Sequence, residues 1–215
     1  SSTDIFNDKI KRNFKNMFEK QQVDFFSGAG DIWQIANKYL FTEISDGIII
    51  VDQHVAHERI LYEEALEALE GEGLSSQTIL FPETINFLPD DYNSFLEILK
   101  YLKKIGFKMR EFGENSIIVE GLPASIPLGS EDNLLRNILD EYRKFKDNDS
   151  SFMHNIAATY ACKGAIKAGD KLEKEEMMSL FNKLFSTNNP YYCPHGRPII
   201  VRMSEFELDK RFERK

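Results

Sequence analysis

A run of four branched aliphatic residues, followed by a polar motif and then by a helical pattern, is the feature that most constrains this chain. Ile48–Val51 predict a buried strand, because a continuous branched run is typical of a sheet covered on both faces. Apolar residues then recur at helical spacing as far as Leu69, so we expect a helix from about Gln53 to a stop at Gly71. The chain therefore turns from strand to helix near Asp52.

The residues at this turn are of the kinds that bind metals. Asp52 lies at the carboxyl end of the expected strand, and His54 and Glu58 are four residues apart, on one face of the expected helix. One imidazole and two carboxylates then converge where α/β sheets commonly bind ligands, which indicates a metal site. The alternative is a surface hydrogen bond or ion pair between His54 and Glu58, worth roughly 0.2–0.5 kcal/mol.

Composition sets the broad class. The chain has 215 residues, of which 42% are hydrophobic, enough for one large or two small cores. Its net charge of -8 disfavours a free-standing DNA-binding domain, so another factor would have to bring it to nucleic acid. Two cysteines are too few for a secreted disulfide scaffold, and we read neither a membrane span nor a signal peptide. We expect a cytoplasmic protein.

The pattern along the chain indicates a mixed α/β (α+β) fold. Residues 1–29 are expected to be a linker or tail with one short amphipathic helix, and the composition changes near residues 75 and 149. We expect a strand at Trp33–Glu43, a turn at Ser45–Gly47, helices at Asp91–Lys104, Ser130–Lys146, Phe152–Ala168 and Glu175–Phe185, a hairpin of Phe107–Phe112 with Ser116–Gly121, an exit linker at Asp147–Ser151, a strand at Pro198–Arg202 and a final helix capped by Ser204.

Further candidate ligands lie in the last third of the chain. Cys193 and His195 are spaced so that one loop could present a thiolate and an imidazole to a metal, and Cys162 lies in a helix of small residues. A free cysteine in a helix rich in alanine, such as Cys162, is more often a packing residue than a ligand. Thiolate and imidazole favour zinc, whereas carboxylate and water favour manganese or magnesium. Arg197 could hold a phosphate oxygen. The mixed ligand set, large enough for two metals, is Asp52, His54, Glu58, Cys162, Cys193 and His195.

Three motifs resemble those of a known family. The run from Asp52 to Glu63 matches Asp-Gln-His-Ala-x-x-Glu-x-x-x-x-Glu, with Val55 in place of Ala, and the Cys-Pro-His-Gly-Arg-Pro run matches fully at Cys193–Pro198. Ala161–Lys163 resembles an Ala-Cys-Arg motif, although lysine lacks the planar fork of arginine. Weaker matches are Gln34 and Phe212–Arg214. The sequence thus resembles, from about Gly30 to its end, the C-terminal domain of the MutL family of DNA mismatch-repair proteins, of the type that carries a nicking endonuclease.

The resemblance implies a two-lobed fold. A dimerisation and metal-site lobe would come from residues 30–75 and 149–215, with a regulatory, clamp-binding lobe inserted at residues 76–148. It implies homodimers or paralogue heterodimers, and recruitment by the replication sliding clamp through a Gln-x-x-Leu-x-Pro sequence. The corresponding residues are Gln77, Leu80 and Pro82, although the same segment is also read as a plain strand.

The implied function is a metal-dependent endonuclease domain that nicks one strand of duplex DNA. Asp52, His54 and Glu58 would be catalytic, Zn²⁺ or Mn²⁺ (with Mg²⁺ as a further option) would be the cofactor, and Gln53 and Arg197 would support a loop or a phosphate. ATP would act only through the family's amino-terminal ATPase domain, which this sequence does not contain. The mismatch-recognition protein would be met through the full-length protein, in the bacterial cytoplasm at the nucleoid.

A rival interpretation has no catalysis. In it, the chain is a dimerisation and clamp-docking module in which zinc ties the Cys193 loop to the helix expected from Gln53. A structural zinc site is closed and tetrahedral, whereas a catalytic site keeps a position open to water.

Overall fold

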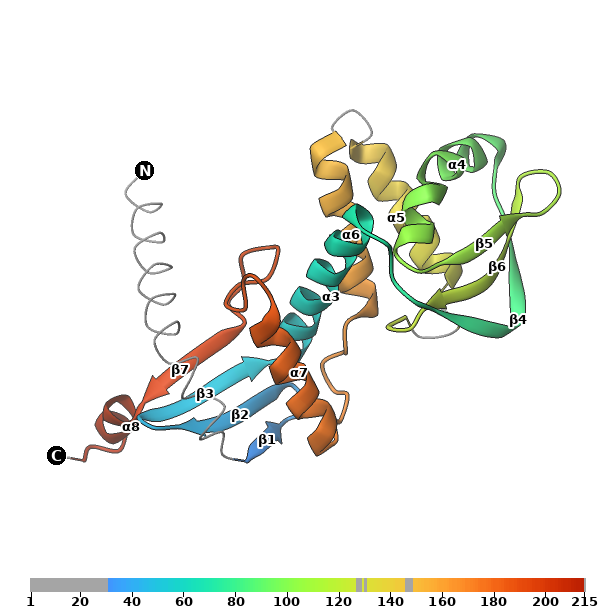
Figure 1. Ribbon diagram of the computed structural model, residues 1–215. Helices are drawn as coiled ribbons and strands as arrows, with labels where there is room; N and C mark the ends of the chain where they lie inside the picture. Colours follow the sequence, from blue (N-terminus) through green and yellow to red (C-terminus); the bar gives the residue numbers. More distant parts are fainter. Residues whose placement is uncertain (1–30, 127–128, 130, 146–148, 215) are drawn as a thin grey trace.

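The computed structural model describes residues 31–126, 129, 131–145 and 149–214. The linker and amphipathic helix expected at residues 1–29 lie outside this part of the chain. Helices pack against two separate sheets (Figure 1), and every strand pairing between the described residues is antiparallel. The mixed α+β class expected from the sequence is confirmed.

The first sheet joins segments from both ends of the described chain. Its order is β1-β2-β3-β7, so its last strand in sequence pairs with the third. The turn expected at Ser45–Gly47 joins β2 to β3, and a side chain at Gly47 would collide with the backbone of β7. The strands are β1 (Ile32–Ile35), β2 (Tyr39–Ile44), β3 (Gly47–Asp52) and β7 (Ile200–Ser204).

The single strand expected at Trp33–Glu43 is two strands. Ala36 and Asn37 take positive φ angles of 53° and 49° and reverse the chain, and Lys38 N donates to Ile35 O at 3.1 Å. Asn tolerates the left-handed conformation, but Ala rarely adopts it, so the residue types gave little sign of the turn.

The aliphatic run at Ile48–Val51 forms a strand, but it is not buried on both faces. Ile49 and Val51 are fully buried, whereas Ile48 and Ile50 are partly exposed. This alternation is typical of an antiparallel sheet with one covered face. The rule that places ligands at the carboxyl ends of parallel strands therefore does not apply to Asp52.

The second sheet has the order β4-β6-β5 and lies between the halves of the first sheet in sequence. The hairpin of β5 with β6 is confirmed. In β4 the register shifts between Thr78 and Glu83, and Leu80 and Phe81 lie in this irregular stretch, 89% and 86% exposed. The elements are β4 (Ser76–Asn86), α4 (Pro89–Lys104), β5 (Lys108–Glu111), β6 (Ser116–Pro123) and α5 (Glu131–Phe145).

The later helices differ from the prediction at their ends. Helix α6 (Asp149–Gly164) already includes part of the expected exit linker at Asp147–Ser151, and it stops before Ala168. A side chain at Gly164 would crowd Ile126 and Leu61, which explains a glycine where α6 meets α3. Helices α7 (Lys174–Ser186) and α8 (Glu205–Arg211) follow, and the capping box of Ser204 with Glu207 is confirmed.

Helix α3 (Gln53–Glu70) runs through both hydrophobic clusters. Its first turns pack Val55 and Ile60 against the four-stranded sheet and α7, and its later turns pack Ala65 and Leu69 against the larger cluster around the second sheet. Helix α6 packs along it, and Figure 1 shows both helices between the two sheets. No helix of the described residues is long and apolar enough to cross a membrane.

Candidate metal centre

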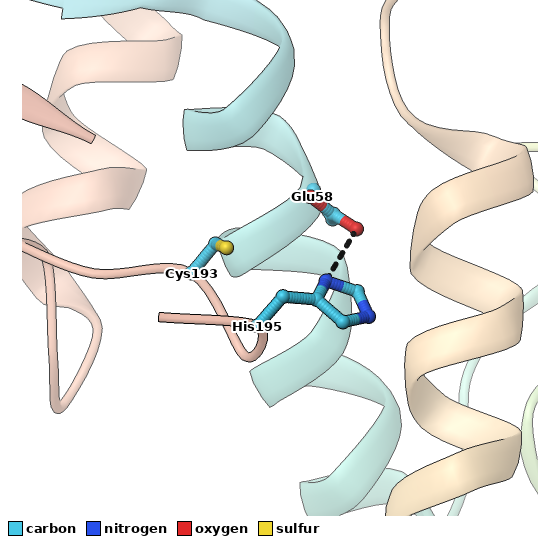
Figure 2. Close-up of side chains that lie close together, drawn as sticks. All are labelled: Glu58, Cys193 and His195. Atoms are coloured by element: carbon cyan, nitrogen blue, oxygen red, sulfur yellow. Dashed lines mark ion pairs between the residues drawn. The ribbon is translucent and has the colours of Figure 1, made fainter. Parts of the chain in front are cut away.

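Three of the six predicted ligands come together. Ligand atoms of Glu58, Cys193 and His195 all lie within 4.8 Å of one another, and no other group of three or more such side chains does so among the described residues. Nδ1 of His195 is 3.4 Å from Oε1 of Glu58, and Figure 2 shows the pair facing each other with Cys193 beside them. Glu58 and Cys193 are buried, and the His195 side chain is 55% exposed.

Local backbone chemistry shapes the segment that carries Cys193 and His195, which we call the Cys193 hairpin (residues 191–199). Ile199 N donates to Tyr191 O and Cys193 N donates to Arg197 O, both at 2.9 Å. Gly196 N closes the tip by donating to Cys193 O at 2.9 Å. Proline as the second residue of this turn and Gly196 at φ 81° suit the geometry. Arg197 N also donates to the Cys193 sulfur at 3.4 Å.

Asp52 begins helix α3. Its Oδ1 accepts hydrogen bonds from His54 N at 3.0 Å and Val55 N at 3.1 Å, which satisfies two amides that a helix start leaves without partners. The Asp52 carboxylate is therefore engaged as the N-cap, and it is outside the cluster of Glu58, Cys193 and His195.

Two histidines hold the chain that follows α6. Nδ1 of His54 lies 2.7 Å from Ile166 O, and Ile166 N donates to Nδ1 of His57 at 2.9 Å. A carbonyl only accepts, so Nδ1 of His54 carries a hydrogen in this contact. Burial, together with the charges of Lys183 and His54, lowers the pKa of His57 to about 4. His57 is thus neutral at pH 7, a role that nothing in the sequence indicated.

Gln53 anchors the loop that follows α6 through hydrogen bonds. It is completely buried, and its Nε2 donates to the carbonyl oxygens of Asn37, Asp170 and Lys167 at 2.9, 3.0 and 3.2 Å. Its Oε1 accepts from Nε2 of Gln34 at 2.7 Å. The Gln53 amide is therefore used within the protein, as a support for this loop.

The remaining predicted residues lie nearer the surface. Cys162 is exposed and is outside the cluster in the described part of the chain, but it lines with His195 a hollow of about 380 Å³ between α5 and α6. Arg197 is exposed beside His195. Gln77 Nε2 donates to Ile126 O at 3.1 Å and Pro123 O at 3.3 Å, whereas Leu80 and Pro82 are exposed.

Fold and site together define a two-sheet α+β domain with a candidate metal centre beside the helix that links its two cores. Residues 32–172 match the family described as "MutL C terminal dimerisation domain". The chain belongs to this family, which confirms the resemblance seen in its motifs.

Curated relatives agree. The chain is 46% identical over 188 residues to the "DNA mismatch repair protein MutL" of Pelodictyon phaeoclathratiforme, covering 86% of this chain and 30% of that protein. It is 44% identical over 206 residues to the protein of the same name from Chlorobium chlorochromatii, covering 93% and 30%. The chain thus spans about 30% of the length of these relatives.

Proposed function

We propose that this chain is the metal-dependent endonuclease domain of a DNA mismatch-repair protein and that it nicks one strand of duplex DNA. The observation that carries the proposal is the meeting of Glu58 from α3 with Cys193 and His195 from a hairpin far along the chain. A carboxylate, a thiol and an imidazole within 4.8 Å are a donor set of the kind that zinc takes in enzymes, with three protein ligands and one position left open.

The residues around the cluster are of the kinds that act on a phosphodiester. A bound divalent cation would polarise a phosphoryl oxygen and lower the pKa of a water molecule. His195 gives the cluster a face toward solvent, and the neighbouring exposed Arg197 offers the planar fork that binds phosphate oxygens. His54 would offer its Nε2 to a second ion, with Cys162 as a further ligand. Asp52, His54 and Glu58 would be the catalytic set. Mn²⁺ and Mg²⁺ are the alternatives to Zn²⁺.

Recruitment by another protein would explain how a chain of net charge -8 acts on DNA. Leu80 and Phe81 are almost fully exposed in the irregular part of β4, as docking residues for the sliding clamp would be. Gln77 and Pro82 flank them. The mismatch-recognition protein and ATP would act through other parts of the full-length protein.

Self-association would use the outer face of the first sheet. Trp33, Phe41, Ile50 and Val201 are in register across its four strands, and Trp33 and Val201 are 49% and 50% exposed. An apolar row across an uncovered sheet face suits a homodimer interface.

One observation favours the rival function, a dimerisation and clamp-docking module with a structural zinc site. The Asp52 carboxylate caps α3 and is outside the cluster. In that case zinc would only tie the Cys193 hairpin to α3.

Nicking of supercoiled plasmid with Mn²⁺ and Zn²⁺, with and without the sliding clamp, separates the two functions. Asp52→Asn keeps the helix cap, because Asn and Asp cap equally well, but it removes the charge. We expect Asp52→Asn and Glu58→Ala to slow nicking roughly 100-fold or more, and the neighbouring Glu64→Gln to leave it unchanged. Wild-type speed in Asp52→Asn would refute its catalytic role. Tight zinc with no nicking, even with the clamp, would establish the rival function.

A further inference from the structure

A carboxylate outside the cluster holds the chain just before the Cys193 hairpin. Oε2 of Glu63 accepts from Asn188 N at 2.6 Å and from Asn188 Nδ2 at 3.1 Å. Its Oε1 accepts from Asn189 N at 3.2 Å and lies 2.9 Å from Nε of Arg59. The Glu63 and Arg59 side chains are only 16% and 11% exposed. Both carboxylate oxygens are thus committed to the segment between α7 and the hairpin and to α3 itself.

The two sides of the Cys193 hairpin are held in different ways. The second side continues into β7, which pairs with β3, and Asp52 N donates to Ile199 O at 3.1 Å. The first side of the hairpin begins at Tyr191, shortly after Asn188 and Asn189. Glu63 therefore ties this side to the same helix that presents Glu58.

We propose that Glu63 is a positioning residue for the metal cluster. By fixing the start of the hairpin relative to α3, its carboxylate sets where Cys193 and His195 stand with respect to Glu58. The proposal rests on metal binding as given under the proposed function. It assigns Glu63 no direct contact with the metal, because its oxygens are engaged by Asn188, Asn189 and Arg59.

A charge-removing substitution tests this arrangement sharply. Glutamine has one acceptor oxygen, so Glu63→Gln keeps the bonds of one carboxylate oxygen and turns an NH₂ group toward the donors that faced the other. The groups that orient metal ligands commonly contribute 10–100-fold to metal affinity. Glu64→Gln is the matched control, because Glu64 is the adjacent residue and pairs with exposed Lys183, at 3.3 Å.

The experiment measures the zinc affinity of the whole chain by chelator competition, and amide hydrogen exchange of the metal-free protein. We expect Glu63→Gln to bind zinc about 10-fold to 100-fold more weakly, with faster exchange confined to residues 188–197. Glu64→Gln should match wild type in both. Undiminished zinc affinity in Glu63→Gln would overturn the proposal. Weaker affinity with faster exchange throughout the protein would also overturn it, because that pattern is general destabilisation.

Failure of the proposed function gives a different result. If the wild type binds neither zinc nor manganese, the metal-dependent function fails, and with it the role of Glu63 toward a metal. Exchange at residues 188–197 in Glu63→Gln would then show whether Glu63 still holds the hairpin.

Discussion

Oε1 of Glu58 faces Nδ1 of His195 across 3.4 Å, with Glu58 buried in α3 and His195 exposed at the tip of a hairpin. The sulfur of Cys193 completes the group from a buried position. A metal held here would meet protein on one side and solvent on the other. This asymmetry is what a catalytic site needs and a closed structural site lacks.

Replacing each cysteine in turn separates the two predicted thiol ligands. We expect Cys193→Ser to weaken zinc binding by more than the roughly 100-fold that supporting residues contribute, because it removes a ligand of the cluster. Cys162→Ser should cost zinc affinity only if a metal also reaches the hollow beside His195. Stoichiometry by elemental analysis and zinc titration check this, and equal affinities in wild type and Cys193→Ser would refute the cluster as a zinc site.

Stability of the metal-free protein should fall as the pH drops from about 6.5 to about 4. The pKa of His57 is about 4 in the folded protein against an ordinary value of 6.5. The unfolded chain therefore binds more protons in this window, which lowers its free energy relative to that of the folded protein. Protonation would also cost the bond from Ile166 N. Urea unfolding at several pH values, with a chelator present, measures the slope. His57→Gln should flatten it, and an unchanged slope would contradict the assignment.

A charge in the apolar row on the first sheet should break the proposed homodimer. Ile50 pairs with Phe41 on one side and Val201 on the other, so Ile50→Glu would place a carboxylate inside the proposed interface and weaken self-association at least about 100-fold. Sedimentation equilibrium reads the dissociation constant. Phe112→Glu, at a 49% exposed position beside β5, is the control. If the dimer persists in Ile50→Glu, the interface lies elsewhere on the protein.

Removing the two exposed apolar side chains of β4 should weaken the proposed clamp binding without unfolding the protein. Leu80→Ala with Phe81→Ala deletes groups that contact solvent almost completely, so the melting temperature should hold while clamp affinity falls at least about 10-fold. Surface plasmon resonance against immobilised clamp measures the loss. Leu88→Ala, 72% exposed just after β4, should bind normally, and equal losses in both proteins would point to a non-specific apolar effect.

Local signals in the sequence predicted the fold well. The helix from Gln53 to Gly71, the turn before Gly47 and the capping box at Ser204 depend on neighbouring residues, and all are confirmed. The turn at Ala36 was missed because alanine seldom takes a positive φ. Sheet burial was wrong at Ile48, because an aliphatic run does not report whether a second layer covers the sheet.

The site was predictable only as a set of residue types. Motif spacing singled out Glu58, Cys193 and His195, which the fold brings together, and also Asp52, His54 and Cys162, which lie outside the cluster. The ligand role of all six residues stays a prediction. The motif ends at Glu63, but the partners of the supporting residues had no local signal. Glu63 contacts Asn188, and His57 contacts Ile166. The residues of each pair are more than a hundred positions apart in the chain, so these contacts form only when the protein folds.

The placement of the cluster bears on the order in which this protein can fold. Helix α3 and the Cys193 hairpin are separated by the whole second sheet and by α4 to α7, so the site cannot close early through a short loop. During synthesis, Glu58 would leave the ribosome long before Cys193 and His195, and β3 could not pair with β7 until β7 is synthesised. The candidate metal centre would then assemble last, after the second sheet has its own core. A nascent chain would pass through most of its folding without the site that the proposed nuclease activity needs.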